Sequence, residues 1–276
     1  MGTEQDVARH YTRGGLEQKI LDALVADGKD IDKLAPSDLS GADEFHLGWR
    51  AATVELAKDL GLAPGMHVLD VGSGIGGPAR YFAEAHGCRV TGIDLTPEFV
   101  EVANAITRRC GLADRVEFRQ GSALSLPFAD GAFDAATMIH VGMNIPDKAA
   151  VFGEVRRVLK PGARFGVYDV MRVGDGGIPY PMPWAETADT SFVETPDTYR
   201  RLLNHAGFGI EAEHDRRGLA IELGRRMRED AAKHGPPPLG LHVLIGPAAT
   251  QRLGNMMRTL EGGGIAPVEF VARVAG

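Results

Sequence analysis

Residues 67–78, HVLDVGSGIGGP, read as a short apolar strand that runs into a glycine-rich turn and then into a helix. The glycines carry no Cβ, so the backbone of the turn can pass close beneath a ligand. The helix that follows presents unpaired N–H groups to the same place. A second apolar strand, 89–93, is followed by Asp94, whose carboxylate can accept hydrogen bonds from two ribose hydroxyls. The pattern therefore predicts a nucleoside-bearing cofactor at the carboxyl ends of these strands.

The glycine pattern alone is compatible with two kinds of cofactor. Gly72, Gly74 and Gly77 also fit the G-x-G-x-x-G pattern of dinucleotide-binding proteins, which would make the chain an NAD(P)-dependent oxidoreductase. Asp70 favours a different cofactor, because it lies at the end of the strand, just before the first glycine. A carboxylate there repels a pyrophosphate and attracts a cationic amine or sulfonium.

Four further blocks of sequence follow the glycine turn. The five blocks together are VLDVGSGIGG (68–77), GIDL (92–95), GSALSLPF (121–128), FD (133–134) and EVRRVLKPG (154–162). With these blocks, the stretch 66–169 resembles the class I S-adenosylmethionine-dependent methyltransferases, in the small-molecule branch that includes ubiquinone/menaquinone-type and sarcosine/dimethylglycine-type enzymes. The resemblance implies an α/β fold with a seven-stranded Rossmann-like sheet and helices on both faces. It also implies S-adenosylmethionine as cofactor and S-adenosylhomocysteine as product.

The resemblance assigns roles to particular residues. Asp70 and the glycine loop would face the amino-acid end of the cofactor, Asp94 would hold the ribose, and Ser122 and Ala123 would edge the adenine. Many family members have an acid where this chain has Ser122, and a carboxylate accepts the adenine amino group more strongly than a hydroxyl does. The predicted cofactor-binding residues are Asp70, Gly72, Ser73, Gly74, Gly76, Asp94, Leu95, Ser122, Ala123, His140 and Tyr11. Arg13 is a further candidate, to pair with the cofactor carboxylate.

Methyl transfer from a sulfonium requires the nucleophile, the methyl carbon and the sulfur to be collinear. Positioning and desolvation supply most of the acceleration, and effective molarity alone is worth roughly 7–11 kcal/mol. His140 follows the strand at 133–139 and is the candidate general base, since a neutral imidazole there can take a proton from an amine or a hydroxyl. The alternative is a histidine that is bonded to backbone and shapes the pocket wall.

Four residues are predicted to contact the acceptor molecule. Met143 and Asn144 share the loop that contains His140, Tyr168 ends a later strand, and Trp184 lies in the stiff segment YPMPW. Each has packing as its alternative role. The acceptor atom is left open as nitrogen, oxygen or an activated carbon. The nine histidines show no metal-ligand spacing, so no metal site is predicted.

Bulk composition excludes several classes of partner. Lys plus Arg is 30 and Asp plus Glu is 37, a net charge of −7 that argues against nucleic acid. Two cysteines exclude a disulfide framework and favour a cytoplasmic location. No apolar run approaches the roughly 18 residues of a membrane span. The expected partner is a small-molecule acceptor, and the oligomeric state is not predicted. A non-catalytic, S-adenosylmethionine-binding regulatory protein remains an alternative.

Periodicity and turn residues predict the remaining organisation. We expect an N-terminal helical cap (1–65), an α/β core (66–216), and a helical insertion with the last strand of the core (217–276); a separate helical lobe at the C-terminus is the alternative. The segment 160–162, Lys-Pro-Gly, is predicted to be a turn. Helices are expected at 49–60, 148–159, 217–233 and 247–260, and strands at 115–120, 133–139, 163–169, 208–214 and 268–273.

Overall fold

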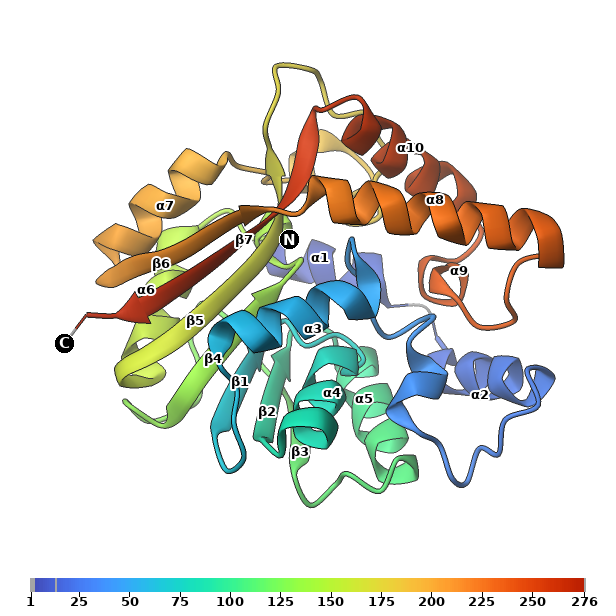
Figure 1. Ribbon diagram of the computed structural model, residues 1–276, viewed down its shortest axis with the longest axis horizontal. Coiled ribbons are helices and arrows are strands. Elements are labelled where there is room, and N and C mark those ends of the chain that lie inside the picture. Colours follow the sequence, from blue (N-terminus) through green and yellow to red (C-terminus); the bar gives the residue numbers. More distant parts are fainter. Residues whose placement is uncertain (1–2, 13, 276) are drawn as a thin grey trace.

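The computed structural model describes residues 3–12 and 14–275. Within them, seven strands form one mixed sheet in the order β3-β2-β1-β4-β5-β7-β6 (Figure 1). Strands β1 to β5 pair in parallel, and β7 runs antiparallel to both β5 and β6. The strands are β1 (His67–Val71), β2 (Arg89–Asp94), β3 (Val116–Gln120), β4 (Phe133–Ile139), β5 (Leu159–Arg172), β6 (Phe208–Asp215) and β7 (Ile265–Val274). The predicted seven-stranded Rossmann-like sheet is confirmed.

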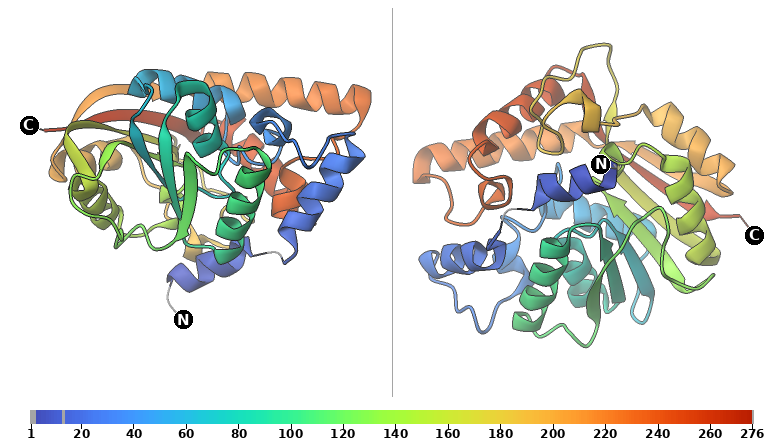
Figure 2. Two further views of the ribbon diagram at one scale, coloured as in Figure 1. Left: turned by 90° about the horizontal axis from the view of Figure 1, so that it is seen from below. Right: turned by 180° about the vertical axis from the view of Figure 1, so that it is seen from behind.

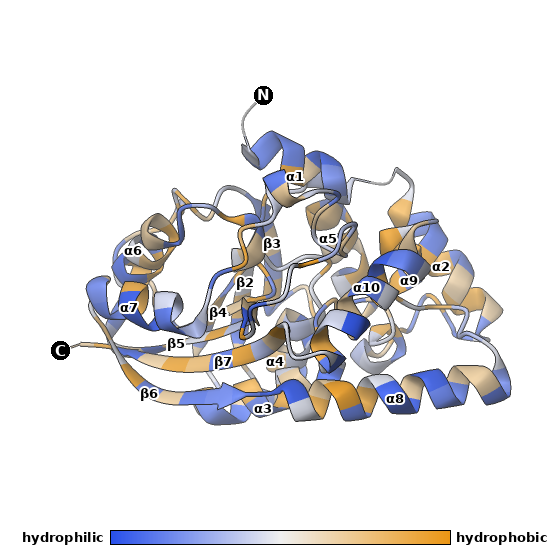
Figure 3. Ribbon diagram, turned by 90° about the horizontal axis from the view of Figure 1, so that it is seen from above, coloured by the Kyte–Doolittle hydropathy of each residue, from blue (hydrophilic) through white to orange (hydrophobic). Residues whose placement is uncertain are grey.

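Helices cover both faces of the sheet, because successive side chains of each strand point to opposite sides. Val68 packs with α3, α4 and α5, whereas Leu69 and Val71 pack with α6 and α7. These helices are α3 (Trp49–Leu60), α4 (Gly77–His86), α5 (Pro97–Arg109), α6 (Lys148–Val158) and α7 (Pro196–His205). In Figure 3 β7 is mostly hydrophobic, while α1 (Thr3–Tyr11) is mostly hydrophilic.

The N-terminal segment forms α1 (Thr3–Tyr11), α2 (Leu16–Ala26) and the short helix η1 (Pro36–Leu39). Leu16, Ile20 and Leu24 of α2 are fully buried against α5 and α9 (Leu241–Ile245), because their spacing places them on one face of the helix. The sequence did not predict α1, and no described residue of that helix is buried. Arg13 lies outside the described residues.

Three helices separate β6 from β7: α8 (Arg217–His234), α9 (Leu241–Ile245) and α10 (Ala249–Glu261). The predicted helices at 217–233 and 247–260 correspond to α8 and α10. Strand β7 then returns between β5 and β6, so the C-terminal segment contributes to the sheet (Figure 2). The division into a cap, a core and a C-terminal part stays a prediction.

One predicted turn is wrong. Residues 160–162 belong to β5, where the pairing with β4 shifts between Phe133 and Ala135. Gly162 has a φ of 73° inside this irregular stretch. Proline and glycine therefore mark a bulge within a strand here, a position that these residues also favour.

The short helices η2 (Gly142–Asn144) and η3 (Ala188–Thr190) lie in the loops after β4 and β5. In the described part of the chain, no helix combines the length and the apolar composition that crossing a membrane requires.

Candidate active site

A cavity of about 490 Å³ opens at the carboxyl ends of β1, β2 and β4. This is the point where the strand order reverses, the usual ligand-binding position of an open α/β sheet. Its floor is the glycine loop after β1, and its walls come from α1, the segment 43–49, the loop after β4, and side chains of α9 and α10. The volume falls within the range of small-molecule sites.

The glycine loop owes its shape to backbone hydrogen bonds and left-handed residues. The N–H groups of Gly72 and Ser73 donate to the carbonyl of Ile93, at 2.8 and 3.1 Å. Gly72, Gly74 and Gly76 have φ values of 69°, 54° and 88°, a region that non-glycine residues rarely adopt. A Cβ would overlap Val141 at Gly72 and Phe118 at Gly76, whereas at Gly74 it would meet no atom within 4 Å. Gly74 thus borders open cavity space, and Gly76 is required for packing and does not line the cavity.

Asp70 presents a free carboxylate oxygen at the cavity floor. Its Oδ1 accepts from the hydroxyl of Thr137 at 2.7 Å, and its Oδ2 is buried without a hydrogen-bond partner among the described residues. The hydroxyl of Ser73 is likewise buried and unpaired within that part of the chain. Burial raises the pKa of Asp70 to about 7; the Thr137 hydrogen bond opposes this rise, and the charge of Asp94 adds to it.

Asp94 holds the glycine loop and the start of α5 together. Its Oδ2 accepts from the N–H of Gly74 and its Oδ1 from the N–H of Thr96, each at 2.8 Å. Burial raises the pKa of this carboxyl, and the two backbone donors counteract the rise. Each oxygen keeps a second lone pair for a ligand hydroxyl. Leu95 also lines the cavity.

The structure separates the predicted adenine-side pair. Ala123 lines the cavity, but Ser122 does not. The Ser122 hydroxyl donates to the carboxylate of Glu4 on α1 and accepts from the N–H of Leu124 at 3.0 Å. Glu4 itself lines the cavity. The Glu4 carboxylate of α1 therefore lies beside Ser122, the position at which many family members have an acidic residue.

His140 lies at the end of β4 in the cavity wall. Its φ of 53° is unusual for a non-glycine residue, and its N–H donates to the carbonyl of Tyr168 at 2.7 Å. Its ring stacks on Tyr168 and meets the ring of His46 edge-on, with centroids 5.6 and 5.9 Å away. Nε2 is buried without a partner among the residues described. Burial, and secondarily His46, hold the pKa of His140 well below its ordinary value, so the ring is neutral at physiological pH.

Three of the four predicted acceptor residues line the cavity: Met143, Asn144 and Trp184. Asn144 connects two walls, because its Oδ1 accepts from the Tyr11 hydroxyl at 2.9 Å and its Nδ2 donates to the Trp184 carbonyl at 2.8 Å. Tyr11 lines the cavity as well.

Tyr168 does not line the cavity. It is 1% exposed, and its hydroxyl donates to the carbonyl of Leu47 at 2.7 Å. Burial raises the pKa of this phenol far above its ordinary range. Tyr168 therefore supports the segment 43–49 from behind, and the strand-end argument overlooked that a bulky residue can pack into the core.

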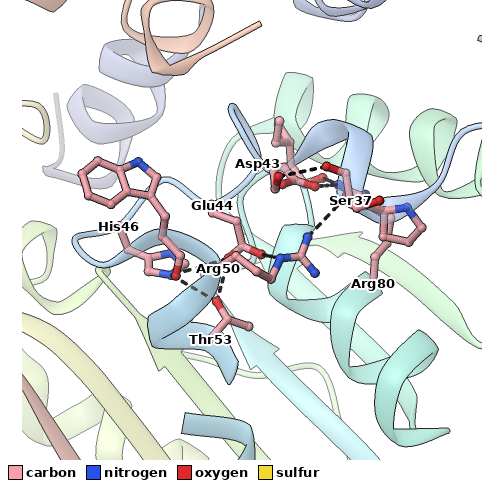
Figure 4. Close-up of polar contacts among 11 residues, drawn as sticks. Ser37, Asp43, Glu44, His46, Arg50, Thr53 and Arg80 are labelled. Atoms are coloured by element: carbon pink, nitrogen blue, oxygen red, sulfur yellow. Dashed lines mark hydrogen bonds and ion pairs between the residues drawn. The ribbon is translucent and has the colours of Figure 1, made fainter. Parts of the chain in front are cut away.

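Sequence reasoning missed the polar network between η1 and α3 (Figure 4). Asp43 pairs with Arg80 of α4 at 2.8 Å, and both side chains are fully buried. Glu44 pairs with Arg50 at 2.5 Å and accepts from the Thr53 hydroxyl at 2.6 Å. The only signal in the sequence is a run of two acids, an aromatic residue and a histidine, DEFH at 43–46, before a helix.

Two of these missed residues, Asp43 and His46, line the cavity together with Trp49. The Oδ1 of Asp43 and the indole Nε1 of Trp49 are buried and unpaired within the described chain. Among the described residues that line the cavity, none is Lys or Arg.

Away from the cavity, Asp59, His214 and Glu269 lie close enough to share a metal ion. Arg216 already pairs with Asp59 at 2.8 Å and with Glu269 at 3.0 Å. The absence of a metal stays a prediction.

Known proteins similar to this chain decide its family. A family model described as a methyltransferase domain matches residues 69–167. An O-methyltransferase of Pyrenophora dematioidea is 30% identical over 222 residues, which cover 74% of this chain and 82% of that protein. The chain belongs to the methyltransferase family. This methyltransferase is also 44% identical over 114 residues to sterol 24-C-methyltransferase ERG6B of Gibberella zeae, a match that spans 41% of this chain and only 30% of that relative.

Solved structures share the fold of this methyltransferase along nearly its whole length. Geranyl diphosphate C-methyltransferase from Streptomyces coelicolor A3(2) has a TM-score of 0.69 at 18% identity, covering 99% of this chain and 98% of that one. The [4+2]-cyclase SpnF has a TM-score of 0.69 at 24% identity, covering 99% and 97%. At these identities the likeness concerns the fold alone.

Proposed function

We propose that this methyltransferase takes the methyl group from S-adenosylmethionine and transfers it to a hydroxyl group of an apolar small molecule. One observation carries the proposal: a single cavity joins a glycine loop with two acids, suited to a cationic nucleoside, to an apolar wall with neutral histidines. The cofactor and the small-molecule acceptor follow from the family and the site. The hydroxyl as acceptor atom is the finer part of the proposal.

The residues present fit the cofactor. Asp70 Oδ2 and Ser73 Oγ are buried and lack partners among the described residues, and Gly74 leaves open space above the loop. An unpaired buried carboxylate oxygen is costly unless a cation or a donor completes it. When bound, S-adenosylmethionine supplies a methyl group on a positively charged sulfur. Asp70 would balance that positive tail, Asp94 would accept from the ribose, and Ala123 and Glu4 would border the adenine.

The chain's own contribution to the reaction is alignment and exclusion of water. Tyr11 and Asn144 hold α1 against the Trp184 segment by the two hydrogen bonds described above. Apolar side chains of Phe45, Met143 and Met256 complete the wall. Fixing the acceptor oxygen in line with the methyl carbon is where most of the rate enhancement arises.

The residues that line the cavity favour a neutral, apolar acceptor. Arg and Lys are common partners of a phosphate or diphosphate group, and the described cavity lining offers neither. The lowered pKa values keep His46 and His140 neutral, so each can accept a hydrogen bond from an O–H group. A ring nitrogen with a low pKa still suffices as a base, because the oxygen becomes strongly acidic as it bonds to the methyl carbon.

Methyl transfer to defined probes tests the proposal. Purified protein is incubated with methyl-tritiated S-adenosylmethionine and a panel of apolar alcohols and phenols, such as cholesterol, geraniol and 2-naphthol. Their methyl ethers serve as controls, because they keep the carbon skeleton but lack the hydroxyl proton. We expect labelled ether from at least one hydroxyl compound and none from the controls. Label transferred to carbon, or to geranyl diphosphate in preference to geraniol, would contradict the hydroxyl assignment.

A further inference from the structure

His46 is held in the cavity wall by a chain of hydrogen bonds that leads away from the cavity (Figure 4). Its Nε2 lies 3.0 Å from the carbonyl oxygen of Trp49 and 3.1 Å from Oγ1 of Thr53. The Thr53 hydroxyl lies 2.6 Å from Oε2 of Glu44. All three side chains, His46, Thr53 and Glu44, are buried, at 6%, 1% and 0% exposure.

The partners fix which nitrogen of His46 carries the proton. A carbonyl oxygen can only accept, so Nε2 must donate to Trp49. The Thr53 hydroxyl donates to Glu44, and its oxygen therefore accepts from Nε2 as well. Nδ1 is then the unprotonated nitrogen of this ring. The left-handed conformation of Trp49, at φ 45°, follows Gly48 at φ 89° and closes the turn that brings this carbonyl to the ring.

We propose that His46, and not His140, receives the proton of the acceptor hydroxyl, and that Thr53 passes a proton on to Glu44. The inference rests on the proposed function and names a base for it. As the acceptor oxygen bonds to the methyl carbon, its O–H bond breaks and a bond from that proton to Nδ1 of His46 forms. Nε2 gives its own proton to Thr53 Oγ1, and the Thr53 hydroxyl proton moves to Oε2 of Glu44. The electron pair of the broken C–S bond remains on sulfur.

His140 lacks such support. Its Nε2 is buried without a partner, and its ring makes no hydrogen bond to another described residue, so no second group in this part of the chain orients the ring by hydrogen bonding or takes a second proton from it. A base that is oriented by a hydrogen-bonded third group is the arrangement that recurs in proton-transferring sites. His140 instead stacks on Tyr168 and shapes the wall beside His46.

The surroundings of Glu44 make it the end of the path. Burial and the negative charge of Asp43 raise the pKa of Glu44 to about 8, against the opposing pull of Arg50, Thr53 and Arg80. Burial lowers the pKa of His46 to about 4, with Arg50 acting in the same direction and the Trp49 hydrogen bond against it. A proton on His46 is therefore less stable than a proton on Glu44. Only the ionised form of Glu44 can receive the proton, so the rate of methyl transfer rises as the pH increases through about 8.

Two variants of the same residue test the relay. Thr53→Val removes the hydroxyl with little change of shape, and Thr53→Ser keeps it. We expect Thr53→Val to lower kcat at least tenfold, within the range of general base catalysis, with an unchanged Kd for S-adenosylhomocysteine, and Thr53→Ser to recover most of the rate. Glu44→Gln, which still accepts from Thr53 but takes up no proton, should abolish the rise of the rate near pH 8.

A second readout needs no acceptor molecule. In ¹⁵N-histidine-labelled protein, His46 should show a protonated Nε2 and an unprotonated Nδ1 at pH 7, and its Nε2 signal should shift as pH passes about 8. Glu44→Gln should remove that shift, and His46→Gln assigns the signal.

The outcomes separate the two proposals. A protonated Nδ1 on His46, or a kcat and pH profile that Thr53→Val leaves unchanged, would overturn the relay while methyl transfer stands. Absence of methyl transfer to every probe together with the expected ring form of His46 would overturn the hydroxyl acceptor, and with it the relay, while the hydrogen-bond path from His46 to Glu44 stands.

Discussion

Replacing Asp94 by alanine should weaken cofactor binding without unfolding the protein. The carboxylate accepts two backbone N–H groups at 2.8 Å and retains lone pairs for the ribose. Hydrogen bonds to a charged group are worth roughly 1.5–3 kcal/mol. Loss of the ribose contact therefore predicts about a tenfold to 150-fold higher Kd for S-adenosylhomocysteine.

Tryptophan fluorescence offers a direct assay for this change. The chain has two tryptophans, Trp49 and Trp184, and both line the cavity. Quenching on titration with S-adenosylhomocysteine gives the Kd of each variant.

Asp134 provides a matched control at the opposite end of the sheet. It too accepts from a backbone N–H, that of His67 at 2.9 Å, and it does not line the cavity. Asp134→Ala should leave the Kd within a factor of two or so. A less than threefold effect of Asp94→Ala, or equal effects of the two variants, would refute the ribose assignment.

Four further predictions concern the cavity and the glycine loop beneath it. Burial raises the pKa of Asp70 to about 7, and only the ionised carboxylate attracts a cation. S-adenosylmethionine should therefore bind more tightly as the pH rises through about 7. Calorimetry should show this dependence, and Asp70→Asn should remove it. The same raised pKa means that folded Asp70 binds protons more tightly than the unfolded chain, so unliganded stability should fall as pH rises from about 4 to 7, as urea titrations can check. Glu4→Ala should raise the Kd of S-adenosylhomocysteine several-fold and that of its adenine-free part, homocysteine, not at all; equal Kd values for wild type and variant with the full ligand would remove Glu4 from the adenine side. Gly76→Ala should lower the Tm by several degrees because its Cβ overlaps Phe118, whereas Gly74→Ala should mainly weaken cofactor binding; the opposite pairing in melting and binding assays would show that the loop is misassigned.

The sheet and the cofactor side could be predicted because their signals are local. Val68 to Val71, the glycine turn and Asp94 lie within a single β-α-β unit, so spacing alone brings them together. The parallel pairing of β1 with β2 and β4 then places Asp70, Asp94 and His140 at one edge. Among the predicted cofactor-binding residues, Gly76 and Ser122 do not line the cavity. The strand order places both near it, but their contacts with neighbouring side chains turn them away.

The acceptor side could not be predicted because its contacts join distant parts of the chain. Asp43 pairs with Arg80, and Tyr11 bonds to Asn144 across the cavity. No periodicity in 43–53 indicates that His46 and Glu44 will be buried rather than solvated, and charged residues in a loop are usually exposed. Tyr168 differs from the prediction for another reason. It lies where β5 reaches the site, but side chains alternate between the two faces of a strand, and this one packs into the core beside α3 and α4.

The cavity beside Asp70 and Asp94 suits a cationic nucleoside better than a dinucleotide, because ionised carboxylates attract a sulfonium and repel a pyrophosphate. Isothermal calorimetry of the unmodified protein with S-adenosylmethionine, which carries the positive sulfur, and separately with NADH decides between the two ligands. We expect saturable one-to-one binding of S-adenosylmethionine and no heat of binding with NADH. Tight binding of NADH with no binding of S-adenosylmethionine would overturn this assignment.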